Sequence, residues 1–266
     1  MAQEERIAKL LARAGVASRR EVERMIEAGR ISVKGDVLTN PAFKLASLDG
    51  VLVDGKPVAA AGAPRLWLYH KPTGLVTTER DEKGRDTVFG ALPDDLPRVL
   101  SVGRLDINSE GLLLLTNDGG IKRKLELPET GWTRKYRVRV KGQPTDAMLE
   151  PLRKGIAPEG EKFRPMDVRL DRQQGANAWL TLTLAEGKNR EIRRSMEEIG
   201  LIVNRLIRVS YGPFQLGELP AGAVKEIAPR ILADQLGLPR PEKKVEKRPA
   251  RGRPTNRRSK KPGKPR

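Results

Sequence analysis

The sequence predicts an α+β fold built around a mainly antiparallel sheet. From residue 65 to about residue 233, most of the recognisable patterns are those of β-strands. The clearest lies at residues 136–140, where apolar side chains alternate with Arg137 and Arg139. Helical patterns are few in this region, and they do not follow each strand in the regular rhythm of parallel βαβ units.

Length and charge restrict the classes of protein to consider. The 266 residues suggest one large domain or two unequal ones, and the formal net charge is +18. Such an excess of basic residues favours a polyanionic partner, with nucleic acid first and an anionic membrane second. The sequence lacks both an apolar run near the roughly 18 residues needed to span a membrane and a signal-peptide pattern. We therefore expect no membrane partner. The absence of cysteine excludes disulfides and predicts a cytoplasmic location.

The N-terminal residues predict a compact unit of two helices and short strands. Apolar residues at helical spacing predict a helix over residues 5–14, and a Ser18–Glu21 capping box begins a second helix that ends at Gly29. Short strands are expected at residues 31–33 and 51–53. We place the boundaries of this unit at residues 4–62. Its basic residues beside the helix ends favour contact with phosphates; those we select are Lys9, Arg19, Arg20 and Arg30.

A featureless stretch of small residues at 59–64 predicts a linker to a second unit, which we place at residues 65–236. Strands are expected there at residues 65–70, 112–116, 136–140, 179–184 and 203–209. Residues 117–120 have turn composition and are expected to end the second of these strands. Helices are expected at residues 145–154 and 190–199.

The last 27 residues have a different character. Residues 240–266 contain 13 basic and 2 acidic side chains, with several prolines. Such a segment cannot bury enough apolar surface to offset its ordering entropy, so we expect a disordered tail. Its charge suits a non-specific electrostatic arm for a polyanion.

Asp106 is the strongest candidate for chemistry. It lies between Arg104 and Glu110, directly before the apolar residues 112–115, which predict a buried strand. A carboxylate beside a rigid strand, with cations nearby, suits a nucleophile. The alternative is an aspartate that only closes a turn by bonding its own backbone. With no cysteine, only one histidine (His70) and no phosphate-binding loop motif, we expect no metal and no cofactor.

Five segments in this order resemble one family. Residues 6–20 resemble an S4 RNA-binding domain. Residues 69–78, 103–106, 135–138 and 186–194 are similar to the catalytic motifs of bacterial ribosomal RNA pseudouridine synthases. The group that they resemble comprises synthase A of small-subunit RNA and synthases B, E and F of large-subunit RNA. Within that group the chain is most similar to the B type. The resemblance covers roughly residues 4–235, and all five segments together are highly specific.

The resemblance implies a fold and a reaction. It implies a small S4-like domain followed by a mixed α+β catalytic domain of pseudouridine synthase type, which isomerises a uridine of ribosomal RNA without a cofactor. Asp106 matches the family's catalytic aspartate, and Tyr136 matches the tyrosine that stacks on uracil. Arg193 matches the basic residue that pairs with the aspartate. Pattern alone favours a core role for Tyr136 and a backbone-bonded role for His70.

The expected partner is structured ribosomal RNA, free or in an assembling particle, and we expect a monomer. Further RNA contacts are predicted from the cations near the motifs, which are Arg104, Lys71, Arg190 and Arg194. Large-subunit RNA is the first expectation, and small-subunit RNA or tRNA is the alternative. A non-catalytic RNA-binding assembly factor is the alternative from another class. A third candidate is a glycosidase that uses Asp106 and Glu110 as its two carboxylates.

Overall fold

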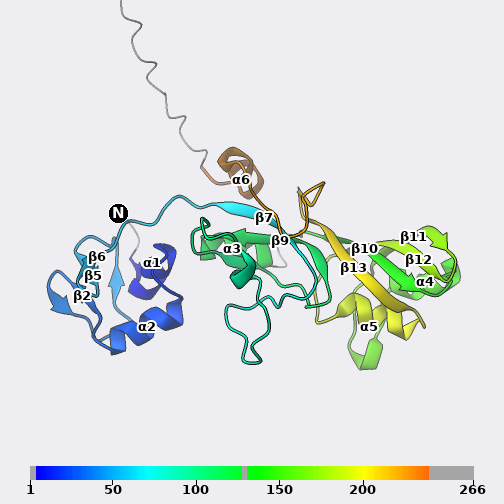
Figure 1. Ribbon diagram of the computed structural model, residues 1–266, viewed down its shortest axis with the longest axis horizontal. Coiled ribbons are helices and arrows are strands. Elements are labelled where there is room, and N and C mark those ends of the chain that lie inside the picture. The colour runs from blue at the N-terminus through cyan, green and yellow to red at the C-terminus, as the bar shows by residue number, and fades with distance from the viewer. Residues whose placement is uncertain (1–3, 128–130, 240–266) are drawn as a thin grey trace, which may run out of the picture.

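The computed structural model describes residues 4–127 and 131–239 of the chain. Figure 1 shows an elongated molecule, with a small N-terminal unit at one end and a long twisted sheet that forms the rest. The N-terminal unit holds two helices, a four-stranded sheet of order β3-β2-β5-β6, and the separate pair β1–β4. Its elements are β1 (Glu5–Arg6), α1 (Ile7–Arg13), α2 (Arg19–Glu27), β2 (Ile31–Val33), β3 (Asp36–Val37), β4 (Lys44–Leu45), β5 (Val51–Val53) and β6 (Lys56–Pro57).

The N-terminal unit has its own apolar core. Ile7 and Leu11 of α1 pack with Val22 and Ile26 of α2 against the small sheet. The predicted cap of the second helix is confirmed, because the hydroxyl oxygen of Ser18 accepts a hydrogen bond from the Glu21 amide at 3.2 Å. The predicted linker at residues 59–64 contains neither helix nor strand.

The remaining strands form one nine-stranded sheet. Its order is β11-β12-β10-β13-β9-β7-β15, with β14 paired to β13 and β8 paired to β9. All pairs are antiparallel except β13–β9, which confirms the predicted fold class. The strands are β7 (Leu66–Lys71), β8 (Leu100–Val102), β9 (Glu110–Thr116), β10 (Arg134–Lys141), β11 (Asp167–Gln174), β12 (Asn177–Leu184), β13 (Ile202–Tyr211), β14 (Phe214–Gln215) and β15 (Val224–Glu226).

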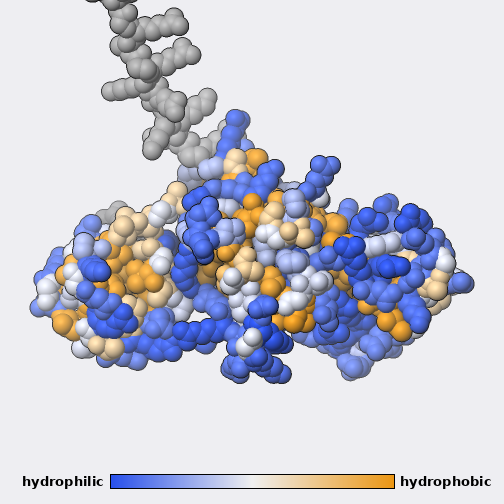
Figure 2. Space-filling view, viewed as in Figure 1, coloured by the Kyte–Doolittle hydropathy of each residue, from blue (hydrophilic) through white to orange (hydrophobic). Residues whose placement is uncertain are grey.

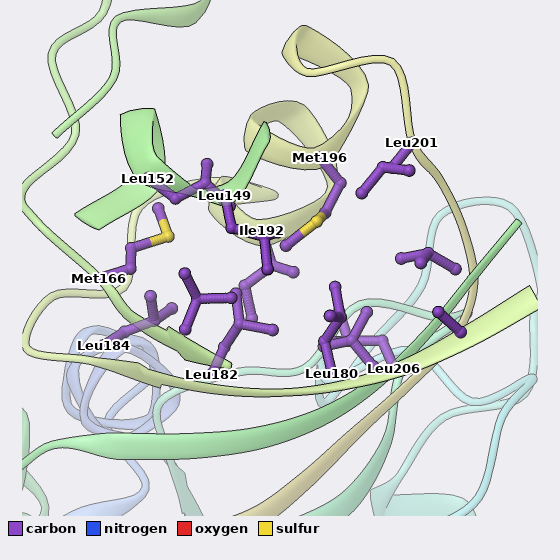
Figure 3. Packing of buried hydrophobic residues seen from close by; sticks show 14 of the residues in the cluster. Leu149, Leu152, Met166, Leu180, Leu182, Leu184, Ile192, Met196, Leu201 and Leu206 are labelled. Carbon is purple, nitrogen blue, oxygen red and sulfur yellow. The ribbon is translucent and has the colours of Figure 1, made fainter. Parts of the chain in front are cut away.

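Helices cover this sheet unevenly. The helices of this unit are α3 (Gly119–Glu126), α4 (Asp146–Lys154), α5 (Glu191–Glu198) and α6 (Pro229–Leu236), with 3-10 turns η1 (Phe89–Ala91) and η3 (Pro158–Gly160). Figure 1 shows α4 and α5 together on one side of β10, β12 and β13. In Figure 3, Leu149, Ile192 and Met196 from the two helices meet Leu180 and Leu182 of β12. This packing fixes the start of α5 beside the sheet.

The two halves of the sheet are buried differently. In β7 and β9, side chains on both faces are buried, and one face joins a cluster with α3 and α6 while the other joins a cluster with η1. In β10 and β12, only every second side chain is buried. We call β7 and β9 the doubly covered half, and β10, β11 and β12 the singly covered half.

The structure corrects the expectation for residues 117–120 and contains elements that the sequence did not predict, including β11. Residues 117–120 do not form a simple turn, because the carboxylate of Asp118 accepts hydrogen bonds from the Gly120 and Ile121 amides at 2.7 and 2.9 Å and so caps α3. Strand β11 was not predicted. Since Val168 is its only buried residue, the strand lacks the apolar alternation that would reveal it.

The predicted disorder of residues 240–266 concerns residues outside those described. Across residues 4–127 and 131–239, no helix is both long enough and apolar enough to cross a membrane.

Candidate active site

Asp106 lies in a loop of residues 103–109 that joins β8 to β9. The loop begins at Gly103, whose φ of +66° lies in the left-handed region that favours glycine. The Gly103 amide donates a hydrogen bond to the Glu126 carboxylate of α3 at 2.7 Å. The start of the loop is therefore fixed to the helix that covers the doubly covered half.

Lys71, the last residue of β7, holds the same loop through its side chain. Its side chain is fully buried, and its ammonium donates hydrogen bonds to the carbonyls of Pro72, Asp106 and Ser109 at 2.9, 3.2 and 2.9 Å. Burial lowers the pKa of Lys71 to about 8, although the charges of Asp106 and Glu110 favour the protonated form. A cation that is bonded in this way cannot contact RNA, so the prediction of an RNA contact for Lys71 is wrong.

The segment after β7 holds the loop from the side. The Thr77 hydroxyl donates to the Leu105 carbonyl at 2.8 Å and accepts from the Leu105 amide at 3.3 Å. The Gly74 amide donates to the Ile107 carbonyl at 2.8 Å. Both neighbours of Asp106 are therefore fixed through their backbone atoms.

The Asp106 side chain itself is unengaged. Its carboxylate is half-buried and makes no hydrogen bond or ion pair with any of the residues that the structure describes. The alternative of an aspartate that bonds its own backbone is not what the structure shows. Instead the side chain lines a cavity of about 260 Å³.

Tyr136 lines the same cavity as Asp106. It is half-buried on β10 and packs against the core clusters of both sheet halves. Ile192 of α5, which is almost fully buried, also lines the cavity. The structure thus brings together the predicted carboxylate, an aromatic ring and an apolar wall.

Arg193 does not form the expected ion pair. Among the described residues no ion pair within 4.0 Å joins it to Asp106, and it is not one of the residues that line the cavity. Its guanidinium donates to the carbonyls of Asn108 at 2.9 Å and Val203 at 3.2 Å. Burial and the charge of Arg190 lower its pKa, while the charge of Asp106 acts in the opposite direction. Arg193 therefore braces the loop beyond Asp106.

Arg208 is a cavity residue that the sequence reasoning missed. It lies on β13 opposite Gly111, where any Cβ would approach the Arg208 carbonyl oxygen to 2.4 Å. Its side chain is buried, its Nε donates to the Leu112 carbonyl at 2.7 Å, and one terminal nitrogen has no partner. The signal was a charged residue at an inward position of a strand, between Leu206 and Ser210.

Glu191 is a second missed residue, at the first position of α5. It is buried, it lines the cavity, and one of its carboxylate oxygens accepts a hydrogen bond from the Lys188 amide at 2.9 Å. Burial, together with the charge of Glu186, raises the pKa of Glu191 to about 7. The cavity wall therefore includes a carboxyl group that titrates near neutral pH.

Several predicted RNA contacts line two further clefts, one of which adjoins the cavity. Lys9 and Arg19 line a cleft of about 470 Å³ between the N-terminal unit and α3, together with Arg123. Arg104 and Arg190 line both the cavity and a neighbouring cleft of about 500 Å³. Arg104 and Arg190 are thus the predicted RNA contacts that lie in the same cavity and cleft as Asp106.

The other candidates differ in availability. Arg20 is exposed, whereas Arg30 is paired with Asp54 at 2.6 Å. Arg194 is engaged by the carboxylates of Glu161 at 2.5 Å and Glu159 at 3.0 Å, so its predicted RNA contact is not supported. His70 has the backbone bond expected from the sequence pattern, with its Nδ1 2.6 Å from the Leu219 carbonyl oxygen.

The other carboxylate near the loop, Glu110, does not face Asp106 as a partner. It is paired with Arg205 through contacts of 2.5 and 3.1 Å. This arrangement does not favour a two-carboxylate glycosidase. Within the described parts of the chain, no group of three or more histidine, aspartate or glutamate residues is placed to hold a metal ion.

Comparisons with known proteins identify the family. Residues 65–198 match the family model described as RNA pseudouridylate synthase, and residues 5–49 match the S4 domain. An "Uncharacterized RNA pseudouridine synthase" of Rickettsia felis is 44% identical over 228 residues, which is 86% of this chain and 99% of the relative. A "Ribosomal large subunit pseudouridine synthase B" of Haemophilus influenzae is 41% identical over 264 residues, covering 95% of this chain and 74% of the relative.

A solved structure shows the same fold. The crystal structure of a pseudouridylate synthase superposes with a TM-score of 0.60 at 22% identity, and covers 87% of this chain and 99% of its own. The motif segments at residues 6–20, 69–78, 103–106, 135–138 and 186–194 all lie within the regions that the two family models match.

Proposed function

Since this chain belongs to the RNA pseudouridylate synthase family, we propose that it converts a uridine of ribosomal RNA into pseudouridine, with Asp106 as the residue that acts on the sugar. The ribosomal substrate is supported by the H. influenzae relative, whose name specifies the large ribosomal subunit. Large-subunit RNA is therefore the substrate we propose. The net charge of +18 agrees with a polyanionic substrate of this kind.

The proposed reaction rearranges bonds without redox chemistry. The bond between uracil N1 and ribose C1′ breaks, the uracil turns, and C5 bonds to C1′. The proton on C5 is lost and N1 gains a proton, so the product is an isomer. The reaction needs a carboxylate at C1′, a proton acceptor near C5 and a pocket that retains the free uracil. Asp106 would supply the first, either as a nucleophile or by stabilising positive charge at C1′.

The observation that carries the proposal is the contrast between the fixed backbone of Asp106 and its free carboxylate. Lys71, Thr77 and Gly74 hold the backbone on both sides of Asp106. The carboxylate lies at the cavity with none of its hydrogen-bonding capacity used by the described chain. A group that is held in place in this way suits reaction with a ligand, because productive geometry is then present before binding.

Tyr136 and Ile192 are suited to hold the uracil. An aromatic ring and an apolar side chain on the walls of one cavity can contact the two faces of a planar base. The cavity volume of about 260 Å³ lies just below the range of about 300–1,000 Å³ typical of drug-sized ligands, which suits a single base. The Tyr136 hydroxyl is our candidate for the acceptor of the C5 proton.

The clefts outside the cavity suit the RNA chain that carries the base. Extruding a base from structured RNA costs a few kcal/mol, which contacts to the flanking phosphates must offset. Arg104 and Arg190 line the cavity and its neighbouring cleft, so they are placed to contact phosphates next to the target. The cleft lined by Lys9 and Arg19 would take a more distant part of the RNA.

Release of the C5 proton provides the test. Ribosomal RNA transcribed with uridine tritiated at C5 should release tritium to water when incubated with the wild-type protein. Asp106→Asn should release none, while it binds the same RNA with unchanged affinity. Asp94→Asn, which makes the same change on an exposed loop, is the matched control and should retain full activity.

The same experiment separates the enzyme from an RNA-binding assembly factor. An assembly factor would bind the RNA and release no tritium in any variant. Equal tritium release by the wild type and Asp106→Asn would contradict the role of Asp106 while leaving the reaction itself in place.

A further inference from the structure

The singly covered half of the sheet presents an open face on the side away from the cavity. Its inner face carries Val138, Val140 and Leu182, which pack against α4 and α5. Among the described residues, no helix packs on the opposite face. An exposed sheet face is ordinary in an antiparallel sheet, so the composition of this one decides whether it has a use.

Strand β10 places a row of cations on this face. Lys135, Arg137, Arg139 and Lys141 alternate with the inward residues of the strand, so all four point to the open side. The register with β12 sets Lys135 opposite Thr183, Arg137 opposite Thr181 and Arg139 opposite Trp179. We call this surface the basic sheet face, and its residues are Lys135, Arg137, Arg139, Lys141, Asp167, Arg169, Asp171, Arg172, Trp179, Thr181 and Thr183.

The charges on the basic sheet face are largely uncompensated. No carboxylate lies within 4.0 Å of any of the four β10 cations among the residues that the structure describes. The face carries two carboxylates, Asp167 and Asp171, and Asp171 is bonded to Arg169 at 3.1 Å and to the Thr181 hydroxyl at 2.6 Å. Six cations therefore face two carboxylates. Figure 2 shows mainly hydrophilic residues over the end of the molecule where β10, β11 and β12 lie.

An aromatic ring lies within this positive surface. The Arg137 guanidinium carbon is 4.8 Å from the centroid of the Trp179 ring, and this is the contact that orients the side chain. Arginine and aromatic planes on an open sheet are the surfaces on which unpaired bases stack, while neighbouring cations contact phosphates. Side chains on one face of a strand are spaced by about 6.8 Å, so the four cations form a line about 20 Å long.

We propose that the basic sheet face binds the RNA substrate outside the active-site cleft, through phosphates along β10 and through an unpaired base at Arg137 and Trp179. This inference rests on the proposed function, because it assigns the face to the same RNA. Tyr136 lies between Lys135 and Arg137 in the chain but faces the cavity. RNA that contacts both surfaces must pass around the sheet, so the contact needs an RNA much longer than the strand segment in the cavity.

The test removes charge from this face alone. The triple variant Lys135→Gln, Arg137→Gln and Lys141→Gln changes three exposed side chains. The matched control, Lys154→Gln, Lys225→Gln and Arg230→Gln, removes the same charge from exposed positions elsewhere. Equal melting temperatures of both variants and the wild type establish that the fold is intact.

Binding is measured by filter retention with protein-free large-subunit ribosomal RNA over a range of salt concentrations. The triple variant should bind about tenfold more weakly, and the slope of log affinity against log salt should be less steep by about 2 to 3. The control variant should differ by much less in both. Equal behaviour of the two variants would overturn the proposal.

Two further probes identify other partners. If the triple variant loses binding to polyglutamate, or to vesicles containing phosphatidylserine, but retains its affinity for ribosomal RNA, the face serves an acidic protein or a membrane and the proposal is wrong. None of these measurements requires turnover. A failure to release tritium would contradict the proposed function without changing the binding result.

Discussion

The two halves of the large sheet differ in how many of their faces are buried. In the doubly covered half, Leu113 and Leu114 point to opposite faces, and each is buried in a different core cluster. In the singly covered half, Leu182 is buried, whereas its neighbour Thr183 lies on the open face. Burial on both faces produces the continuous apolar run of β9, and burial on one face produces the strict alternation of β12.

The two halves contribute different parts of the cavity. The doubly covered half supplies the fixed loop that carries Asp106, and buried Lys71 is the link between them. The singly covered half supplies the wall of the cavity through Tyr136 on one face, and on the other face it leaves a charged surface open. The carboxylate that we propose acts on the sugar is thus attached to the part of the sheet with the most buried surroundings.

Paired alanine substitutions give the largest expected effects. Leu113→Ala and Leu114→Ala should each lower the free energy of unfolding by about 2–5 kcal/mol, because each leaves a cavity in a buried cluster. Leu182→Ala should have a similar cost, but Thr183→Ala should change stability by no more than about 0.5 kcal/mol. Urea denaturation measures all four. If either β9 variant kept its free energy of unfolding, or if both β12 variants lost several kcal/mol, the two halves would not differ in burial as described.

The link through Lys71 should affect activity more than stability. Lys71→Met removes the donor to the carbonyls of Asp106 and Ser109, while it also removes a buried charge, so the two contributions to stability partly cancel. We expect a loss of about 10²-fold in the rate of tritium release, because the loop loses the bond that places Asp106. Single-turnover kinetics with saturating RNA measure this loss. An unchanged rate would show that the loop does not depend on the doubly covered half.

Glu191, the buried acid at the start of α5, should make the free energy of unfolding depend on pH. The pKa of Glu191 is raised from 4.5 to about 7 in the folded protein, so the folded state binds a proton that the unfolded state has already released. This contribution to stability is fully present below pH 4.5 and is lost as the pH rises through 7. Glu191→Gln does not titrate. Its stability relative to the wild type should therefore rise by about 1–3 kcal/mol between pH 5 and pH 8.

Thermal or urea unfolding at both pH values measures this change. Glu198→Gln, an exposed change on the same helix, is the control and should show no such trend. If the two variants behave alike, Glu191 does not hold a proton in the folded protein.

Patterns of burial explain what the sequence predicted correctly. The alternation in residues 136–140 and 179–184 predicted both strands and their inward residues, because one face is solvated. The run at residues 112–115 predicted a buried strand, as found in β9. Strand β11 was missed because its pairing with β12 depends on backbone hydrogen bonds, while its side chains are almost all exposed.

The sequence predicted which residues form the site better than it predicted the hydrogen bonds that these residues make. Motif resemblance selected Asp106 and Tyr136, and the structure places both at one cavity. No pattern indicated that Lys71 would turn inward to three carbonyls, or that Arg193 would bond Asn108 and Val203, because such contacts depend on loop geometry. Glu191 was missed because a buried charge on a helix looks like a surface charge in sequence alone, whereas the inward position of Arg208 on β13, between Leu206 and Ser210, was a signal that could have been used.

The most direct test of the proposed function is a map of pseudouridine in ribosomal RNA from cells that lack this protein. We expect at least one position to remain uridine in those cells. Expression of the wild-type protein should restore pseudouridine there, whereas Asp106→Asn at the same cellular level should not. Restoration by Asp106→Asn would contradict the proposed role of Asp106, and a map that does not change when the protein is absent would contradict the proposed reaction.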